Sequence, residues 1–405
     1  IKRADVSKGD IVINDNVNLK GYTNIALFGV DSREGSLDKE AHSDTILIAS
    51  INNKTKDVKL VSVYRDTYLD NTNGEYRKAT ECYYFGGPSR AISMLNKNLD
   101  LDITDFVTVD FTAVADVVDA LGGIDIDVQE DEIVHLNNYQ VEGSQVTGKE
   151  IVPVEYAGLQ TLNGLQALSY CRIRYTASLD MGRTERQRRV LGMLFDKAKI
   201  AGLSSIFKIM DDVFPMVTTS LSKQDILGLI PTLIGYKFTD STGFPQKFKF
   251  SNIKGSIIVP TDLENNVVEL HKFLYDDQDY TPSSEVVARS NKILEIVGGE
   301  SKLDDAAKTT TQDTDTTNAN DTFVWSGDNT SGSTDNSGDY DYDNDYDNGG
   351  YDGGYDNGGG DYGGGGDYDN SGDDGSYDNG GDDTGSDTGG GDYDGGDDTG
   401  GDETG

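Results

Sequence analysis

The sequence predicts a mixed α/β layered domain followed by a long acidic tail. Over residues 1–301, short apolar runs typical of buried strands alternate with longer segments whose apolar residues recur at helical spacing. Beyond residue 301 the composition changes to Asp, Gly, Tyr, Asn, Ser and Thr, and aliphatic residues nearly vanish. A sheet with covering helices is therefore expected only in the first part of the chain.

Three of the apolar runs lie near the start of the chain, at residues 24–30, 45–51 and 58–63. Each has the continuous apolar character of a buried strand. The polar stretch 52–57 predicts a hairpin turn, so the second and third strands are expected to pair antiparallel. That pairing would place Asp44, just before the second strand, and Arg65, just after the third, at the same edge of the sheet.

Helix and strand signals alternate in the middle of the chain. A helix is expected at residues 88–99, where Pro88 suits the first turn. The next expected elements are a strand at 106–110, a helix at 111–121 and a strand at 124–128. This order suggests an α/β crossover unit. Residues 129–155 are polar and dotted with glycine, so a long loop or a small hairpin is expected there.

A helix from about Thr184 to Lys199 carries the most informative pattern. Its apolar stripe consists of Val190, Leu191, Leu194, Phe195 and Ala198. Projecting this stripe back by three and four residues leads to Gln187 and Arg183, so both polar side chains are expected on the buried face. Further helices are expected at 222–234, 262–275 and 284–297, with short strands near 248–250 and 255–259.

The tail, residues 302–405, holds 29 acidic and two basic residues, and therefore −27 of the net charge of −38. It lacks the apolar surface needed to offset chain entropy, and like-charge repulsion extends it, so we predict disorder. Its Asp-rich repeats have neither the regular glycine nor the terminal acid of a calcium loop. A solvated spacer is therefore favoured over a calcium site.

Several function classes are disfavoured by the residues present. The net charge and the lack of a basic patch with interleaved aromatics disfavour nucleic-acid binding. His42, His135 and His271 lack the spacing of a zinc site, and neither a Gly-x-Ser-x-Gly motif nor a phosphate-binding glycine loop occurs. No apolar run approaches the ~20 residues that span a bilayer. The two cysteines leave their pairing open.

Arginines cluster at positions that otherwise predict burial, in the segments 62–67, 171–175 and 181–187. Arginine forms planar, bidentate contacts with phosphate oxygens and keeps its charge. Turn capping would explain Asp31 or Asp44 alone, since each lies at a strand end. Together with the arginines, however, the two carboxylates indicate a phosphate-rich anion held against Mg²⁺.

Some polar residues near the informative helix have simpler explanations. Thr184 and Gln187 fit a capping box in which the glutamine reaches back to the helix start. Acid–base pairs at helical spacing are ordinary on helix surfaces. We therefore assign three arginines to the structure or the surface of the helix: Arg186, Arg188 and Arg189.

Motif blocks in a fixed order make the chain resemble a known family; they are residues 24–33, 43–45, 62–67, 122–125, 162–168 and 172–187. These blocks are similar to those of the catalytic domain of the LytR–CpsA–Psr family of cell-wall enzymes, most closely over residues 22–200. The resemblance implies a mixed central sheet flanked by helices on both faces. We therefore divide the chain into an N-terminal segment 1–21, a catalytic domain 22–301 and the disordered tail 302–405.

The resemblance also implies an activity and a location. Family members transfer anionic glycopolymers, such as wall teichoic acid or capsule, from a polyprenyl-pyrophosphate carrier to peptidoglycan. They work at the extracytoplasmic face of the membrane or in the cell wall of Gram-positive-type bacteria. Such a domain is normally held by one N-terminal transmembrane helix, which is expected to precede Ile1.

Site residues follow from the resemblance by motif. Asp31 and Asp44 would hold Mg²⁺, with Mn²⁺ as an alternative, against the pyrophosphate. The pyrophosphate oxygens would be bound by Arg65, Arg172, Arg174, Arg183 and Gln187, with Arg33 and Lys78 as weaker candidates. The first four would also be catalytic, because positioned positive charge stabilises the negative charge that develops during phosphoryl transfer.

Two other functions stay open from the sequence. The same site could hydrolyse the pyrophosphate with water as the acceptor. Alternatively, the chain could be a non-enzymatic cell-surface binding protein whose acidic tail gathers cations. If the carrier lipid does bind, its tail is expected to need an apolar channel between sheet and helices.

Overall fold

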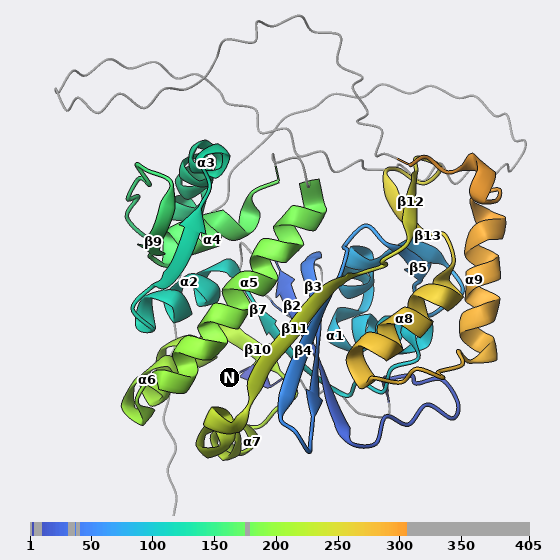
Figure 1. Ribbon diagram of the computed structural model, residues 1–405, viewed down its shortest axis with the longest axis horizontal. Helices are drawn as coiled ribbons and strands as arrows, with labels where there is room; N and C mark the ends of the chain where they lie inside the picture. The colour runs from blue at the N-terminus through green and yellow to red at the C-terminus, as the bar shows by residue number, and fades with distance from the viewer. Residues whose placement is uncertain (1, 4–9, 31–36, 38–40, 175–178, 306–405) are drawn as a thin grey trace, which may run out of the picture. The chain divides into compact units, whose positions relative to one another are not determined.

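Figure 1 shows the protein as a computed structural model, in which residues 2–3, 10–30, 37, 41–174 and 179–305 are described. Within this part of the chain, seven strands form one mixed sheet in the order β1-β10-β7-β2-β3-β4-β11. In that order the strands span Lys2–Arg3, Val217–Thr219, Asp105–Val109, Tyr22–Val30, Ser43–Asn52, Asp57–Val63 and Lys237–Phe244. The three strands expected near the start of the chain are β2, β3 and β4. The antiparallel pairing predicted for the second and third strands is confirmed between β3 and β4, and β3 also pairs antiparallel with β2.

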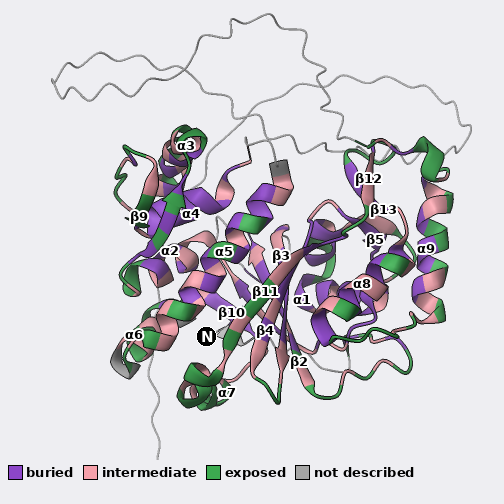
Figure 2. Ribbon diagram, in the orientation of Figure 1, coloured by how far each residue is buried: buried purple, intermediate pink, exposed green. Residues whose placement is uncertain are grey.

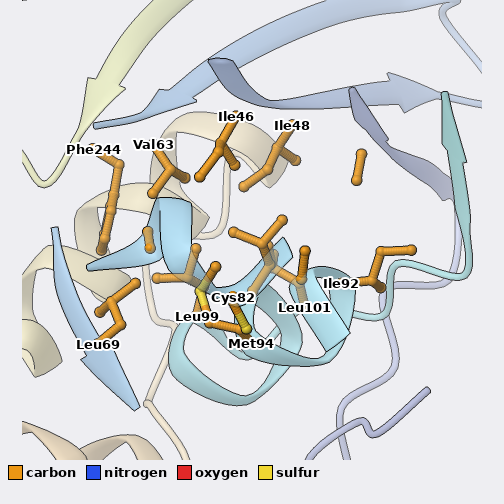
Figure 3. Packing of buried hydrophobic residues seen from close by; sticks show 14 of the residues in the cluster. Ile46, Ile48, Val63, Leu69, Cys82, Ile92, Met94, Leu99, Leu101 and Phe244 are labelled. Atoms are coloured by element: carbon orange, nitrogen blue, oxygen red, sulfur yellow. The ribbon is translucent and has the colours of Figure 1, made fainter. Parts of the chain in front are cut away.

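Side chains of the central strands alternate between two apolar environments. On one face, Phe28 of β2 and Ile46 of β3 belong to the main hydrophobic core. Figure 3 shows part of this core, with Ile46 facing residues of the helix beneath it. The intervening side chains, such as Leu27 and Leu47, line a cavity on the opposite face. Both faces are therefore apolar, which explains why these strands are continuous apolar runs in the sequence.

Helices cover both faces of the sheet, which confirms the predicted fold class. The core side is covered by α1 (Ala79–Leu99), α8 (Leu263–Tyr275) and α9 (Ser284–Ile296). The cavity side is covered by α2 (Phe111–Ala120), α4 (Gly164–Arg172), α5 (Leu179–Ile200) and α6 (Leu203–Val213). In Figure 2 the exposed residues of α7 and α9 lie on their outer surfaces, while the central strands are mostly buried or intermediate.

Smaller elements complete the described part of the chain. Three two-stranded sheets pair β5 (Tyr68–Asp70) with β6 (Tyr76–Lys78), β8 (Ile124–Val128) with β9 (Gly158–Leu162), and β12 (Phe248–Ser251) with β13 (Ile257–Pro260). The helix expected at 222–234 is divided into α7 (Lys223–Leu229) and the 3₁₀ helix η3 (Ile230–Gly235). Two more 3₁₀ turns are η2 (Phe214–Met216) and η4 (Glu300–Lys302).

The prediction of a loop or small hairpin at residues 129–155 is wrong, because most of this segment forms α3 (Glu130–Thr147). The helix begins with a capping interaction in which the Gln129 N–H donates to Glu132 Oε2 over 3.0 Å, and it ends at Gly148 with φ of 68°. Its buried positions are mostly polar or small: Glu132, Leu136, Gln140 and Gly143. The apolar periodicity that identifies an amphipathic helix is therefore missing from the sequence.

The crossover unit expected at residues 106–128 is also wrong. The strand β7 lies in the central sheet, but β8 leaves it and pairs antiparallel with β9. In β8, buried Ile124 and Ile126 alternate with exposed Asp125 and Asp127. That alternation is typical of a sheet with one solvated face, rather than of a parallel strand buried on both sides.

Two helix boundaries differ from those expected. The helix expected from about Thr184 begins at Leu179, so Thr184 and Gln187 lie inside α5 and do not form its cap. The helix expected at 88–99 begins earlier, at Ala79, and is broken at Gly86 and Gly87. Arg172 is the last residue of α4.

The pairing of the two cysteines, which the sequence left open, is answered within the described residues. Cys82 and Cys171 are both buried free thiols and belong to different hydrophobic clusters, so they do not pair. Among the helices of the described residues, none combines the length and apolar character required to cross a bilayer.

Candidate active site

The site begins at one edge of the central sheet, where β3 starts and β4 ends. Because these strands are antiparallel, Asp44 near the start of β3 lies beside Arg65, two residues after β4. Arg65 Nη1 donates to Asp44 Oδ1 over 2.8 Å. The predicted placement of both residues at the same edge is confirmed. Burial favours the neutral carboxyl, but Arg65 and Arg183 outweigh it and hold the pKa of Asp44 below its ordinary value.

Arg183 reaches the same place from the first turns of α5. Its Nη2 donates to the Asp44 backbone carbonyl over 3.0 Å and lies 2.8 Å from Asp180 Oδ1. The residue is only 3% exposed. Burial lowers the pKa of Arg183 to about 10, with Asp180 opposing and the charges of Arg174 and Arg65 adding to the decrease. Arg183 therefore keeps its charge at neutral pH, in a place where positive charges crowd together.

Arg174 also belongs to this cluster. It lies two residues beyond the end of α4 and is half-buried. Its charge acts on both Asp44 and Arg183, lowering the pKa of each. The three arginines predicted around Asp44, namely Arg65, Arg174 and Arg183, are thus brought together by β4, α4 and α5.

Arg65 is also close to two further carboxylates, those of Asp66 and Asp180. Burial opposes its charge, but Asp44, Asp66 and Asp180 outweigh burial and raise the pKa of Arg65 above its ordinary value. Asp66 in turn pairs with Lys78, whose Nζ is 3.0 Å from Asp66 Oδ1. Asp66 therefore lies between Arg65 and Lys78, and Lys78 is at the beginning of α1.

Four buried polar atoms in this region have no hydrogen-bond partner within the described residues: Arg65 Nε, Arg183 Nε, Asp180 Oδ2 and Gln187 Oε1. Asp66 Oδ2 lies 3.5 Å from Arg65 Nε, which is too long for a good hydrogen bond. Buried donors without a partner are costly and rare in folded proteins. Two guanidinium N–H groups are therefore available to an anion beside Asp44.

An apolar cavity of about 640 Å³ lies along the sheet, and its wall reaches Thr45, the residue after Asp44. Thr45, Arg172 and Gln187 are among the polar residues in its wall. Its apolar lining comes from alternate residues of the central strands and from the facing helices, including Leu27, Leu47, Ala49, Leu60, Val107, Val117, Val190, Leu194, Ile209 and Leu233. The cavity is the apolar channel that was expected between sheet and helices.

Arg172 is held at the cavity wall by α3 rather than by the Asp44 cluster. Its Nη2 donates to Glu142 Oε2 over 2.9 Å. Its guanidinium also lies over the rings of Phe111 and Tyr139, at 5.1 and 5.2 Å from their centroids. Sequence reasoning missed both ring partners and Glu142, because two of the three come from the helix that was expected to be a loop.

Comparison with known proteins identifies the family of this chain. Residues 2–259 match the LytR_cpsA_psr family. The chain belongs to this family. It is 30% identical over 225 residues to the polyisoprenyl-teichoic acid–peptidoglycan teichoic acid transferase TagT of Bacillus subtilis, which covers 55% of this chain and 67% of the relative. It is 31% identical over 216 residues to the transferase TagU of Enterococcus faecalis, covering 52% of this chain and 65% of that protein. The matches thus span about two thirds of these relatives.

Solved structures support the same family relationship. A structure described as TagT bound to LI-WTA has 26% sequence identity and a TM-score of 0.51, and the match covers 64% of this chain and 92% of that one. The crystal structure of B. subtilis TagV has 25% identity and a TM-score of 0.51, with 65% of this chain and 99% of that chain covered. The central sheet and its helices are therefore the fold of the LytR_cpsA_psr family.

The residues implied by the family motifs fall into three groups. Asp44, Arg65, Arg174 and Arg183 converge at the sheet edge, as described above. Arg172 and Lys78 pair with Glu142 and Asp66 instead, and Gln187 lies in the cavity wall. Asp31 and Arg33 lie outside the described residues.

The arginines assigned to structure or surface have other partners than this cluster. Arg186 Nε donates to Glu132 Oε1 over 2.8 Å, and both residues are buried. Arg188 Nη1 donates to Thr184 Oγ1 over 3.4 Å. Arg189 donates to the Tyr170 hydroxyl over 2.9 Å. The contacts of Arg186 and Arg189 join α5 to α3 and α4, whereas that of Arg188 lies within α5.

Proposed function

We propose that this protein transfers an anionic glycopolymer, such as a teichoic acid or a capsule polymer, from a polyprenyl-pyrophosphate carrier to peptidoglycan. The observation that carries the proposal is an apolar cavity beside the Asp44 arginine cluster: its wall includes Thr45, the residue after Asp44, and Gln187, one helical turn from Arg183. A polyprenyl pyrophosphate has the same two parts, a dianionic head and a long apolar chain. The names of the curated relatives, which are teichoic acid transferases acting on a polyisoprenyl carrier, support this choice.

The reaction consists of attack by a sugar hydroxyl of peptidoglycan on the phosphorus that carries the polymer. The new O–P bond forms as the bridging O–P bond of the pyrophosphate breaks; polyprenyl phosphate leaves, and the proton of the attacking hydroxyl passes to solvent. Negative charge grows on the phosphoryl oxygens and on the leaving phosphate. Arg65, Arg174 and Arg183 stabilise that charge without a covalent nucleophile, because they are already fixed by the sheet edge and by α5.

Magnesium is proposed as the cofactor, and Asp44 fits this role. Its pKa is lowered, so the carboxylate is ionised, and Arg65 contacts Oδ1 of the two oxygens. The described residues hold no cluster of three or more His, Cys, Asp or Glu side chains suited to a metal. Mg²⁺ usually takes only one or two carboxylates and completes its shell with phosphate oxygens and water. When bound, the ion would neutralise charge on the pyrophosphate, and Mn²⁺ could replace it.

The test uses the full chain, a polyprenyl-pyrophosphate-linked glycopolymer and soluble peptidoglycan fragments. We expect polymer linked to the fragments through phosphate, and loss of that product in Arg174→Ala and Arg183→Ala. Arg189→Ala is the matched control, because its side chain is 45% exposed and lies away from the Asp44 cluster in the same helix. Transfer at the wild-type rate in either cluster variant would overturn the site assignment.

Hydrolysis is the second candidate reaction, since water can replace the sugar hydroxyl at the same site. The two reactions are separated by the product formed with and without peptidoglycan fragments. Free polymer phosphate in the presence of saturating fragments would favour a pyrophosphatase. A reaction on wall polymer also implies work at the extracytoplasmic face of the membrane, which remains part of this proposal.

A further inference from the structure

We propose that Tyr84 and Phe85 form a binding platform for the acceptor, a glycan strand of peptidoglycan, on the side of the active site opposite the lipid cavity. The inference rests on the transfer reaction proposed above and adds the location of its second substrate. It starts from an exposed aromatic pair that the pyrophosphate site does not use.

The pair is exposed although most of its helix is buried or half-buried. Tyr84 is 38% exposed and Phe85 is 47% exposed, whereas the preceding Cys82 and Tyr83 are fully buried. The two exposed rings meet edge to face, with centroids 5.3 Å apart and an interplanar angle of 88°. The ring of His42 stacks on Tyr84 with centroids 5.0 Å apart and planes within 15°. Three rings thus form one aromatic surface.

The platform is held in place by a break in α1. Gly86 and Gly87 have non-helical backbone angles, with φ of 62° at Gly87, and they end the first segment of the helix directly after Phe85. A Cβ at Gly86 would lie 2.6 Å from Arg90 Cδ, so the glycine lets this arginine pack closely. The guanidinium groups of Arg77 and Arg90 lie over the Phe85 ring, at 5.0 and 5.8 Å. The Phe85 ring is therefore packed against two guanidinium groups on the helix surface.

The platform borders the charged cluster. His42 precedes Asp44 by two residues, and the charges of Asp44, Glu81, Arg65 and Lys78 all act on the His42 ring. The helix that carries the pair also starts at the cluster, because the Thr80 N–H donates to the Arg65 carbonyl over 2.9 Å. A sugar on this surface would therefore lie next to the phosphorus bound by the arginines.

The side on which the platform lies agrees with the geometry of the reaction. The cavity is lined by Leu27 and Leu47, while α1 packs against the alternate residues Phe28 and Ile46 on the other face of the sheet. In phosphoryl transfer the attacking and leaving oxygens are roughly in line on opposite sides of the phosphorus. A leaving phosphate attached to a chain in the cavity therefore requires an acceptor that approaches from the α1 side.

The chemistry of the surface suits an amino-sugar chain. The face of an aromatic ring carries partial negative charge and attracts the slightly positive C–H groups on one face of a pyranose. Arg77 and Arg90 at the rim pair with Glu75, Glu81 and the Asn71 carbonyl, and their positive charge favours the carboxylates of a peptide stem. The anionic donor polymer, in contrast, would gain little from aromatic faces.

The experiment compares the full-length wild type with Tyr84→Ala, Phe85→Ala and the double variant. The acceptor probe is a tetrasaccharide of alternating N-acetylglucosamine and N-acetylmuramic acid with peptide stems. We expect the acceptor KM to rise a few-fold in each single variant and about tenfold in the double variant, with the donor KM unchanged. Tyr84→Phe keeps the ring and is expected to keep the wild-type KM. Tyr156→Ala is the control, since that tyrosine is 63% exposed and belongs to the segment between α3 and β9.

Calorimetric binding of the same tetrasaccharide separates this inference from the proposed function, because it needs no turnover. Binding that is weakened in the double variant supports the platform even if no transfer product forms. The platform is overturned if the wild type does not bind the tetrasaccharide, or if the double variant keeps both its dissociation constant and its acceptor KM. Transfer by the double variant with an unchanged acceptor KM would contradict the platform but not the proposed function.

Discussion

Arg65 Nη1 lies 2.8 Å from Asp44 Oδ1, although the two residues are 21 positions apart in the chain. The contact exists because β3 and β4 are antiparallel, so the start of one strand meets the end of the next. The same contact orients a guanidinium toward the place where Arg183 arrives from α5. The strand register therefore builds the first half of the site before any ligand binds.

The Asp44–Arg65 pair is expected to contribute measurably to stability. Both side chains are about three-quarters buried, so a double-mutant cycle with Asp44→Asn and Arg65→Met should give a coupling of about 1 kcal/mol in the free energy of unfolding. The folded pKa of Asp44 lies below its unfolded value, so this contribution is complete above about pH 4 and is lost as the pH falls further. Urea denaturation at pH 7 measures the coupling. Strictly additive single effects would show that the pair is not coupled.

Pyrophosphate with Mg²⁺ is expected to stabilise the protein. Binding relieves the repulsion among Arg65, Arg174 and Arg183 and gives partners to the buried Nε groups. At a ligand concentration of about 100 times Kd, the gain is roughly 2.7 kcal/mol, or about 5–10 °C in Tm. Thermal unfolding across a pyrophosphate titration measures it. Arg183→Ala is expected to show a smaller shift, and a Tm that stays flat in the wild type contradicts the anion site.

Blocking the cavity is expected to discriminate between donors by chain length. Ala49 lines the cavity five residues along β3 from Asp44, which is about 17 Å at the usual rise per residue. Ala49→Trp should therefore lower transfer from an undecaprenyl donor at least tenfold and leave a geranyl donor nearly unaffected. Ala49→Val is the control of smaller volume. Equal losses for the two donors would indicate that the substitution disturbs the fold instead.

Arg186 is expected to act on stability through its buried partner. Glu132 Oε1 lies 2.8 Å from Arg186 Nε, and neither side chain is more than 9% exposed. Arg186→Met leaves a buried carboxylate without its partner and should cost about 3–5 kcal/mol, part of which Glu132→Gln in the same chain restores. The more exposed Arg189→Met should cost less than about 1 kcal/mol. Urea denaturation compares them, and equal costs for Arg186→Met and Arg189→Met argue against the buried pair.

His271 is expected to make stability fall in mildly acidic solution. Its ring stacks on Tyr280 at 3.6 Å, and Nε2 is 2.9 Å from the Leu99 carbonyl oxygen. Burial lowers its pKa, and the nearby charges of Asp100 and Asp277 only partly oppose this. The unfolded state then binds a proton more readily, so stability is complete above about pH 6.5 and decreases as the pH falls below it. His271→Gln keeps a donor for Leu99, and its Tm should change less between pH 7.5 and 5. If the Tm of the wild type and of His271→Gln changed equally between pH 7.5 and 5, this effect would be ruled out.

Local patterns predicted much of this fold. The strands β2, β3 and β4 were identified as continuous apolar runs, and α5 by its apolar stripe, because burial imposes a period on the residues themselves. Where the buried side chains of an element are polar, the same reasoning failed to predict it. The helix α3 buries Glu132 and Gln140, which carry no apolar period, and it was expected to be a loop.

The sequence by itself determined the residue types of the site, its arginine-rich motifs and the shared edge of Asp44 and Arg65, since the last depends only on one hairpin. Tertiary structure alone decided the rest. The pairing of Arg172 with Glu142, the lining of the cavity and the aromatic surface of His42 with Tyr84 join segments far apart in the chain. Their side chains meet only because the sheet stacks α1 on one face and α2, α4 and α5 on the other. No local period records which distant surfaces will be packed together.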